Sequence, residues 1–210
     1  MTKYAAMLVA AFAVASALAA RPAQAADPWG IDPAHSSIVF NITHNNGAGL
    51  VYGRFDKFTG TIMADADHPE NSSVEVHVDS SSVDTAVPMR DKDLQSDKYF
   101  NAAKFTELSF KSTSVSAVDG QPGTFTVSGD FTLLGVTKPL TFTIKQHPVV
   151  TNKKGQMITG FDTAFVLKRS DFGMTTGIPM MGDDVNVMIA FECDKVMPTD
   201  PAQAAPAKTS

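Results

Sequence analysis

The feature that most constrains this chain is a two-residue alternation that runs through residues 124–145. In each half of that segment every second residue is apolar or glycine, first Phe125, Val127, Gly129, Phe131 and Leu133, then Leu140, Phe142 and Ile144. A period of two is that of a half-buried β-strand and not of a helix. Residues 134–139 contain Gly135 and Pro139, which are typical of turns. The sequence therefore predicts a β-hairpin with one apolar face, and we expect Gly135 to hold a backbone angle that other residues disfavour.

The same alternation recurs along most of the chain. Further strands are predicted at residues 35–44, 50–54, 58–64, 74–78, 108–112, 157–167 and 185–191. The pattern stops near residues 88–97, where we expect a short helix. About eight or nine antiparallel strands at hairpin spacing indicate an all-β barrel or sandwich. A barrel of about eight strands either packs solid or holds one small ligand.

Two of these strands have irregular patterns. The apolar parity changes at Phe55, so Gly53 is a candidate β-bulge. Residues 157–167 are apolar on both parities, which predicts a strand that is covered on both sides.

The two ends of the chain differ from the part between them. Lys3, an apolar run over residues 5–20 and an Ala-x-Ala motif at residues 23–25 are typical of a secretory signal peptide, which we assign to residues 1–25. Residues 198–210 are rich in proline and alanine, and we expect a disordered tail there. Residues 26–197 remain as one domain, which we expect in the periplasm of a Gram-negative bacterium or outside the cell.

Charge and cysteine content exclude several classes of protein. Removal of Lys3 and Arg21 with the leader leaves 15 basic against 22 acidic residues, a net charge of −7. This balance disfavours nucleic acid and anionic membrane surfaces as partners. Cys193 is the single cysteine, so an internal disulfide is excluded. We expect Cys193 to be a buried small hydrophobe near the end of a strand and not a redox group.

Catalytic and metal-binding patterns are weak. Asp32, His35 and Ser36 carry the chemical groups of a catalytic triad, but no G-x-S-x-G motif occurs. A hydrogen bond that ties down the first strand is the better interpretation of these residues. The five histidines show no paired ligand spacing, so the sequence indicates no metal and no cofactor.

Arg90, Asp91 and Arg169 each allow two interpretations. Asp91 falls in the first turn of the expected helix, where a negative charge is favourable. Arg90 could bond carbonyl groups or a carboxylate such as Asp84 and so lock the helix over one barrel end. Alternatively, Arg90 points inward and meets the polar head of a ligand, and Arg169 faces the same choice.

Several segments in order resemble the YceI-like family of lipid- or polyisoprenoid-binding proteins. The matching segments are residues 29–36, 53–55 with 58–60, 82–85, 90–94, 99–100, 105–112, 135–140 and 169–173. The resemblance covers residues 29 to about 193, which is nearly the whole mature domain. It implies a lipocalin-like antiparallel β-barrel in the periplasm that holds a long apolar chain. Catalysis is not needed to explain any residue of the sequence, so we do not expect an enzyme.

On this interpretation the inward-facing residues form the binding site for a polyisoprenoid, an isoprenoid quinone or a fatty-acid derivative. They are Ile38, Phe40, Ile42, Phe58, Ile62, Val76, Phe110, Phe125, Val127, Phe131, Phe142, Ile144, Val187 and Ile189. Arg90, Asp91 and Arg169 are the candidate contacts for the polar head or for a lid. We expect a lipid-like ligand as partner, no stable membrane insertion, and a monomer or homodimer. The alternatives are a ligand-free structural or stress-response protein with a solid core and, less favoured, a hydrolase.

Overall fold

The computed structural model describes residues 26–197, so the expected signal peptide and tail lie outside the described residues. Within these residues the chain forms twelve strand segments: β1 (Asp27–Ile31), β2 (Ser37–His44), β3 (Gly49–Phe55), β4 (Phe58–Ala64), β5 (Ser73–Asp79), β6 (Val83–Asp84), β7 (Glu107–Ala117), β8 (Thr124–Leu133), β9 (Val136–Gln146), β10 (Val150–Thr151), β11 (Met157–Lys168) and β12 (Asp184–Lys195). The same residues contain one α-helix, α1 (Pro88–Gln95), and 3₁₀ turns at Pro69–Asn71, Ser80–Ser82 and Arg169–Phe172. None of the helices among residues 26–197 has the length and apolarity needed to cross a bilayer.

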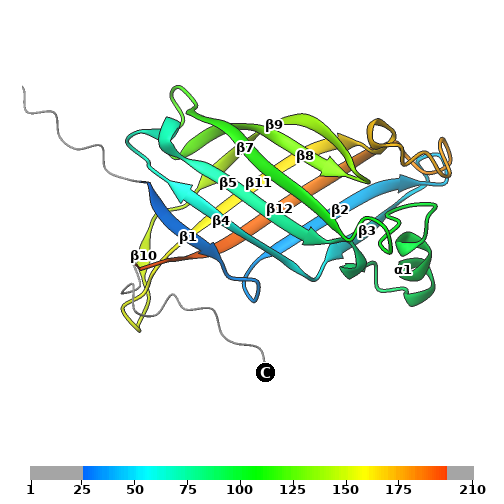
Figure 1. Ribbon diagram of the computed structural model, residues 1–210, viewed down its shortest axis with the longest axis horizontal. Coiled ribbons are helices and arrows are strands. Elements are labelled where there is room, and N and C mark those ends of the chain that lie inside the picture. The colour runs from blue at the N-terminus through cyan, green and yellow to red at the C-terminus, as the bar shows by residue number, and fades with distance from the viewer. Residues whose placement is uncertain (1–25, 198–210) are drawn as a thin grey trace, which may run out of the picture.

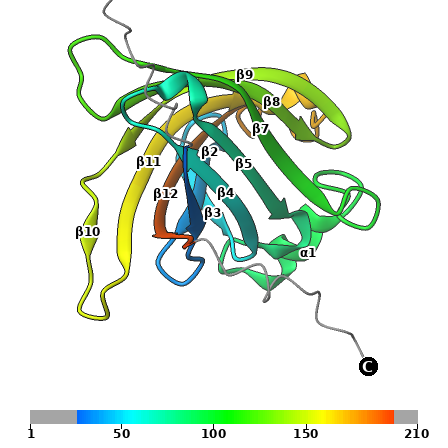
Figure 2. The same cartoon turned by 60° about the vertical axis from the view of Figure 1, so that its left-hand side comes forward.

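The segments join into a closed antiparallel barrel of eight long strands. β1 and β2 both pair with β12, so together they act as one strand that is interrupted at residues 32–36. β3 with β4, and β5 with β6, form two more interrupted strands. The ring closes because β11 pairs with both β12 and β9. Figure 2 shows the strands curving round into this ring, which confirms the predicted lipocalin-like all-β barrel with one short helix.

The predicted hairpin is the β8–β9 pair. Its turn consists of Leu134 and Gly135, whose φ angles are +53° and +72°. Positive φ at both central residues is the geometry of a type I′ turn, which matches the twist of the flanking strands. The expected special angle at Gly135 is confirmed. The turn is shorter than the sequence indicated, because β9 already begins at Val136 and includes Pro139.

Two sequence expectations about strand irregularity were wrong. The register between β2 and β3 is continuous from Ile38–Phe55 to His44–Gly49, so Gly53 is not a bulge. β11 is not covered on both sides, because the outward-facing Val166 is 56% exposed. The inward-facing residues of β11, which include Phe161 and Phe165, form part of the barrel interior.

The two ends of the barrel differ. Figure 1 shows α1 and the β11–β12 connection at one end, and the hairpin that carries β10 at the other. Near the β10 end, side chains fill the interior, and the core there includes Trp29, Val115, Val127 and Cys193, all of them buried. Toward the α1 end the inward-facing side chains leave a space.

Candidate functional site: an apolar cavity inside the barrel

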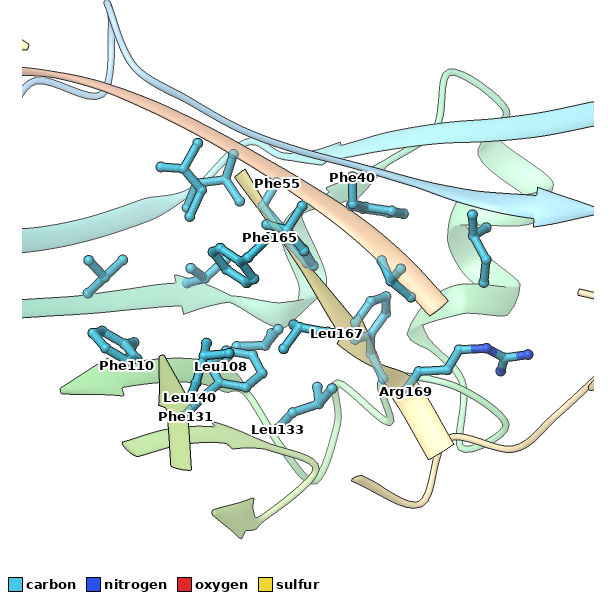
Figure 3. Close-up of a pocket in the computed structure, with 18 of the residues that line it drawn as sticks. Phe40, Phe55, Leu108, Phe110, Phe131, Leu133, Leu140, Phe165, Leu167 and Arg169 are labelled. Atoms are coloured by element: carbon cyan, nitrogen blue, oxygen red, sulfur yellow. The ribbon is translucent and has the colours of Figure 1, made fainter. Parts of the chain in front are cut away.

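The space inside the barrel is a cavity of about 250 Å³. Its walls are inward-facing side chains of β2, β3, β4, β5, β7, β8, β9, β11 and β12, and the segment around α1 closes one end. Figure 3 shows Phe110, Phe131 and Leu140 on one side of this space and Phe165 and Leu167 of β11 beside them. The lining is almost entirely apolar, which suits an apolar ligand.

Most of the predicted interior residues line this cavity. They are Ile38, Phe40, Ile42, Ile62, Val76, Phe110, Phe131, Phe142, Ile144, Val187 and Ile189. The other three do not line it. Phe125 and Val127 face a small void of about 20 Å³ toward the β10 end, and Phe58 packs on Phe191 with ring centroids 5.6 Å apart.

Several lining residues were missing from the sequence prediction. They include Val51, Phe55, Leu94, Tyr99, Phe100, Leu133, Phe165, Leu167 and Val185. The alternation of β11 carried a usable signal, because Phe161, Phe165 and Leu167 share one parity. The segment that holds Leu94, Tyr99 and Phe100 has no strand or helix period, so its inward residues could not be selected from the sequence.

Phenylalanine rings in contact form much of the wall. Phe142 lies between Phe110 and Phe165, with ring centroids at 5.1 Å and 5.0 Å. The Phe142 and Phe165 rings are nearly parallel, with an interplanar angle of 22°. Such offset pairs add attraction beyond the burial of their area. The wall is therefore cohesive although parts of it are only half-buried.

The polar lining residues gather mainly at the α1 end and include Thr85, Arg90 and Asp93. The Arg90 Nε donates to Thr85 Oγ1 at 2.7 Å, and its Nη2 donates to the Thr85 carbonyl at 2.8 Å. Asp91 accepts the Thr85 backbone N–H at 2.8 Å and does not line the cavity. Asp84 pairs with Arg54 instead of Arg90. These bonds hold α1 against the strand end, as the first interpretation of Arg90 and Asp91 predicted.

Arg169 is only 3% exposed and is held by main-chain carbonyl groups. Its guanidinium donates to the carbonyls of Gly182, Met174, Thr176 and Met181. Burial lowers the pKa of this guanidinium from its ordinary value. Figure 3 shows the guanidinium directed away from the phenylalanine cluster, so the stem of the side chain lines the cavity. Arg169 therefore fastens the β11–β12 connection over the barrel end.

The Asp32, His35 and Ser36 group lies outside the cavity lining. Ser36 Oγ donates to the Glu192 carbonyl at 3.2 Å and accepts from the Glu192 N–H at 3.0 Å. The predicted tie of the first strand is confirmed, and its partner is the backbone of β12. His35 Nδ1 bonds Asp32 Oδ2 at 2.7 Å, which raises the pKa of His35 and lowers that of Asp32.

Asp32, His35 and Glu192 place one ligand atom each within 4.8 Å of one another. In the part of the chain that the structure describes, they are the residues with the spacing needed to hold a cation. His35 is mostly exposed, and the grouping arises from β-sheet register across 157 residues of sequence, which no local motif could reveal.

Cys193 is fully buried in β12, where burial raises the pKa of its thiol to about 12. The prediction of a small buried hydrophobe near the end of a strand is confirmed.

Comparisons with known proteins agree with this architecture. The profile of the YceI-like domain matches residues 29–193. A UPF0312 protein from Ectopseudomonas mendocina is 35% identical over 186 residues, which are 88% of this chain and 95% of the relative. The crystal structure of BcnA from Burkholderia cenocepacia is similar with a TM-score of 0.68 at 21% identity, over 77% of this chain and 98% of that chain. A polyisoprenoid binding domain from Saccharophagus degradans, implicated in plant cell wall breakdown, has a TM-score of 0.58 at 16% identity, over 80% of this chain and 98% of that chain.

Proposed function

The chain belongs to the YceI-like family, and from that premise we propose that its barrel binds an extended amphiphile and carries it through the periplasm. The ligand is a polyisoprenoid, an isoprenoid quinone or a fatty-acid derivative. The observation that carries the proposal is the apolar cavity of about 250 Å³ in a barrel whose other end is packed solid.

The distribution of polar groups gives the amphiphile a direction. Phenylalanine and aliphatic side chains surround the middle of the cavity, while Thr85, Arg90 and Asp93 lie together at the α1 end. An apolar chain gains free energy in the first region, and a polar head is better solvated in the second. The tail of the ligand therefore points toward the packed end and the head toward α1.

Arg90 is the residue best placed to meet the head. Its Nε and Nη2 are used by Thr85, and its Nη1 has no hydrogen-bond partner among residues 26–197. No carboxylate of the described chain lies within salt-bridge distance of Arg90. A guanidinium with a free donor favours a ligand whose head accepts hydrogen bonds or carries negative charge.

Export is part of the proposal and is supported by the leader-like pattern of residues 1–25. An exported carrier would receive its ligand from a membrane and release it to another acceptor. In this proposal the protein binds and releases its ligand, and the lipid is the only group that it holds.

Mass spectrometry of organic extracts from protein purified out of its native periplasm identifies the ligand. Repeated recovery of no lipid would favour a ligand-free structural protein.

A matched pair of variants tests whether the cavity is the binding site. Leu167→Trp adds bulk inside the cavity, and Val166→Trp adds the same bulk to the outer face of the same strand. With cis-parinaric acid as a fluorescent probe, we expect Leu167→Trp to weaken binding by about tenfold or more and Val166→Trp to leave it unchanged. Equal binding by the two variants would contradict a site inside the barrel.

The head assignment has its own test. Arg90→Met keeps the length of the side chain and removes its donors. We expect this variant to lose more affinity for cis-parinaric acid than for its methyl ester, because only the acid carries a charge for the guanidinium. An equal loss for both ligands would contradict a contact between Arg90 and the head.

A further inference from the structure

The wall of the barrel has a seam between β9 and β11. These strands pair only at Phe161–Gln146 and Asp162–Lys145. By contrast, β11 pairs with β12 at every position from Ile158 to Lys168. From Thr163 onward, toward the α1 end, β11 therefore has no backbone ladder with β9.

Side chains close the seam where the backbone ladder stops. The Thr163 hydroxyl donates to the Thr143 carbonyl at 2.6 Å, in the place of a backbone N–H. If the register continued, Phe165 would stand opposite Phe142, and these two rings are stacked with centroids 5.0 Å apart. A hydroxyl bond and an aromatic pair thus join the two strands where their backbones are no longer paired.

The seam lies between the inner cavity and a groove on the outer surface. Ile144 of β9, Thr163 of β11 and Ile189 of β12 line both spaces. Near the paired part of the strands the inward residues Ile144 and Phe161 are buried, at 7% and 4% exposed. Phe142 and Phe165 lie beyond the end of the ladder and line the cavity. Along the seam the wall is therefore held by side-chain contacts and not by backbone hydrogen bonds.

We propose that this seam is a lateral portal through which the apolar chain of the ligand enters and leaves, with the Phe142–Phe165 pair as its gate. The inference rests on the proposed carrier function. Parting the seam requires rotation of two side chains and the loss of one neutral hydrogen bond. Opening the α1 end instead requires breaking charge-assisted bonds, namely the four from Arg169 and those that join Thr85 to Arg90 and Asp91. The inward-facing side chains of both strands at the seam are apolar, and the charged groups of the outer groove, Lys145 and Asp162, are not buried, so a hydrocarbon chain passes no buried charge.

A reversible cross-link across the seam tests the portal. Thr143→Cys with Ala164→Cys places two thiols on the outer face, on either side of the seam, where both residues line the groove. Ser128→Cys with Thr141→Cys is the control, because these outward residues pair within the continuous β8–β9 ladder, with hydroxyl oxygens 2.9 Å apart. Cys193 is fully buried and leaves the added thiols as the reactive ones. Each pair is joined by oxidation or by a short bismaleimide.

The measurement is the rate at which cis-parinaric acid leaves the loaded protein for phosphatidylcholine vesicles. We expect the joined seam to slow release by about tenfold or more at unchanged equilibrium affinity, and the joined control pair to leave the rate as it is. Phe165→Leu, without any cross-link, should speed release. Equal release rates for the joined and unjoined seam would overturn the portal while leaving the carrier function intact. Failure of the parent protein to bind any probe would overturn the carrier function and the portal with it.

Discussion

The ring of Phe40 on β2 covers Gly53 on β3, at the place where any other residue would carry its Cβ atom. A Cβ added at Gly53 would overlap Cζ of this ring and lie 2.9 Å from Cε1 and Cε2. The two residues are direct partners in the β2–β3 register. Gly53 therefore leaves the space of a side chain to the aromatic ring. The side chains of β3 do not change parity at Phe55, because Val51, Gly53 and Phe55 all face inward, whereas Leu50 and Tyr52 are exposed.

Gly53→Ala should displace Phe40, which lines the cavity. We expect the free energy of unfolding to fall by about 1–3 kcal/mol, as for other overpacked sites, and ligand affinity to change as well. Gly49→Ala is the control, because it lies on the same strand and a Cβ there meets nothing within 4 Å. Urea unfolding and probe binding measure both effects. Similar values for the two variants would show that the ring moves at no cost.

Gly135→Ala should destabilise the β8–β9 hairpin for two reasons. The φ angle of +72° disfavours a side chain, and a Cβ would lie 2.8 Å from Cε1 of Phe105. Gly155→Ala separates these causes, because Gly155 has a φ of +81° and open space around it. We expect each variant to lose about 1 kcal/mol from the backbone angle and Gly135→Ala to lose more. Equal melting temperatures would mean that Phe105 adjusts freely.

The fold could be predicted almost completely from the sequence, because alternation over eight long strands specifies which face of each strand is buried. The site could be predicted only in part. Parity gives the face of a residue and not its position along the barrel axis, so Phe125 and Val127 were grouped with Phe131 although they lie toward the packed end. That position depends on register between strands and on which end α1 closes.

Other parts of the site depended on contacts between residues distant in sequence. The end of the β9–β11 ladder leaves no trace in the sequence of either strand, because the side chains of both strands continue to face inward and outward in turn past Lys145 and Asp162. Arg169 was identified as a candidate, but its role depended on carbonyl groups of an irregular loop. No periodicity specifies where such carbonyls point.

Cys193 should be inert in the folded protein. Its side chain is fully buried and its thiol pKa is raised to about 12, so little thiolate forms and no reagent reaches it. We expect no reaction with a disulfide reagent under native conditions and one equivalent of reaction in denaturant. Rapid native labelling would show that the β12 end opens locally.

The Asp32–His35 pair should make stability depend on pH. Asp32 raises the pKa of His35 by a hydrogen bond and by its charge, and Glu192 and Asp194 add to this shift. A raised pKa in the folded state stabilises the protein below the unfolded-state pKa, about 6.5 for histidine, and this contribution is lost as the pH rises through the folded-state value. His35→Gln should therefore lower the melting temperature more at about pH 5.5 than at about pH 9. In an Asp32→Asn background the difference between the two pH values should shrink, and its persistence would assign the effect to another group.

Val127→Trp separates the packed end of the barrel from the hollow end. Val127 is fully buried and faces only the void of about 20 Å³, so a larger side chain there has no space. We expect a loss of about 1–3 kcal/mol in the free energy of unfolding. Leu167→Trp adds bulk beside the large cavity and should leave the stability of lipid-free protein nearly unchanged. Thermal unfolding after removal of lipid compares them directly. Equal destabilisation by both variants would mean that the space around Leu167 closes in solution and that the barrel is solid throughout.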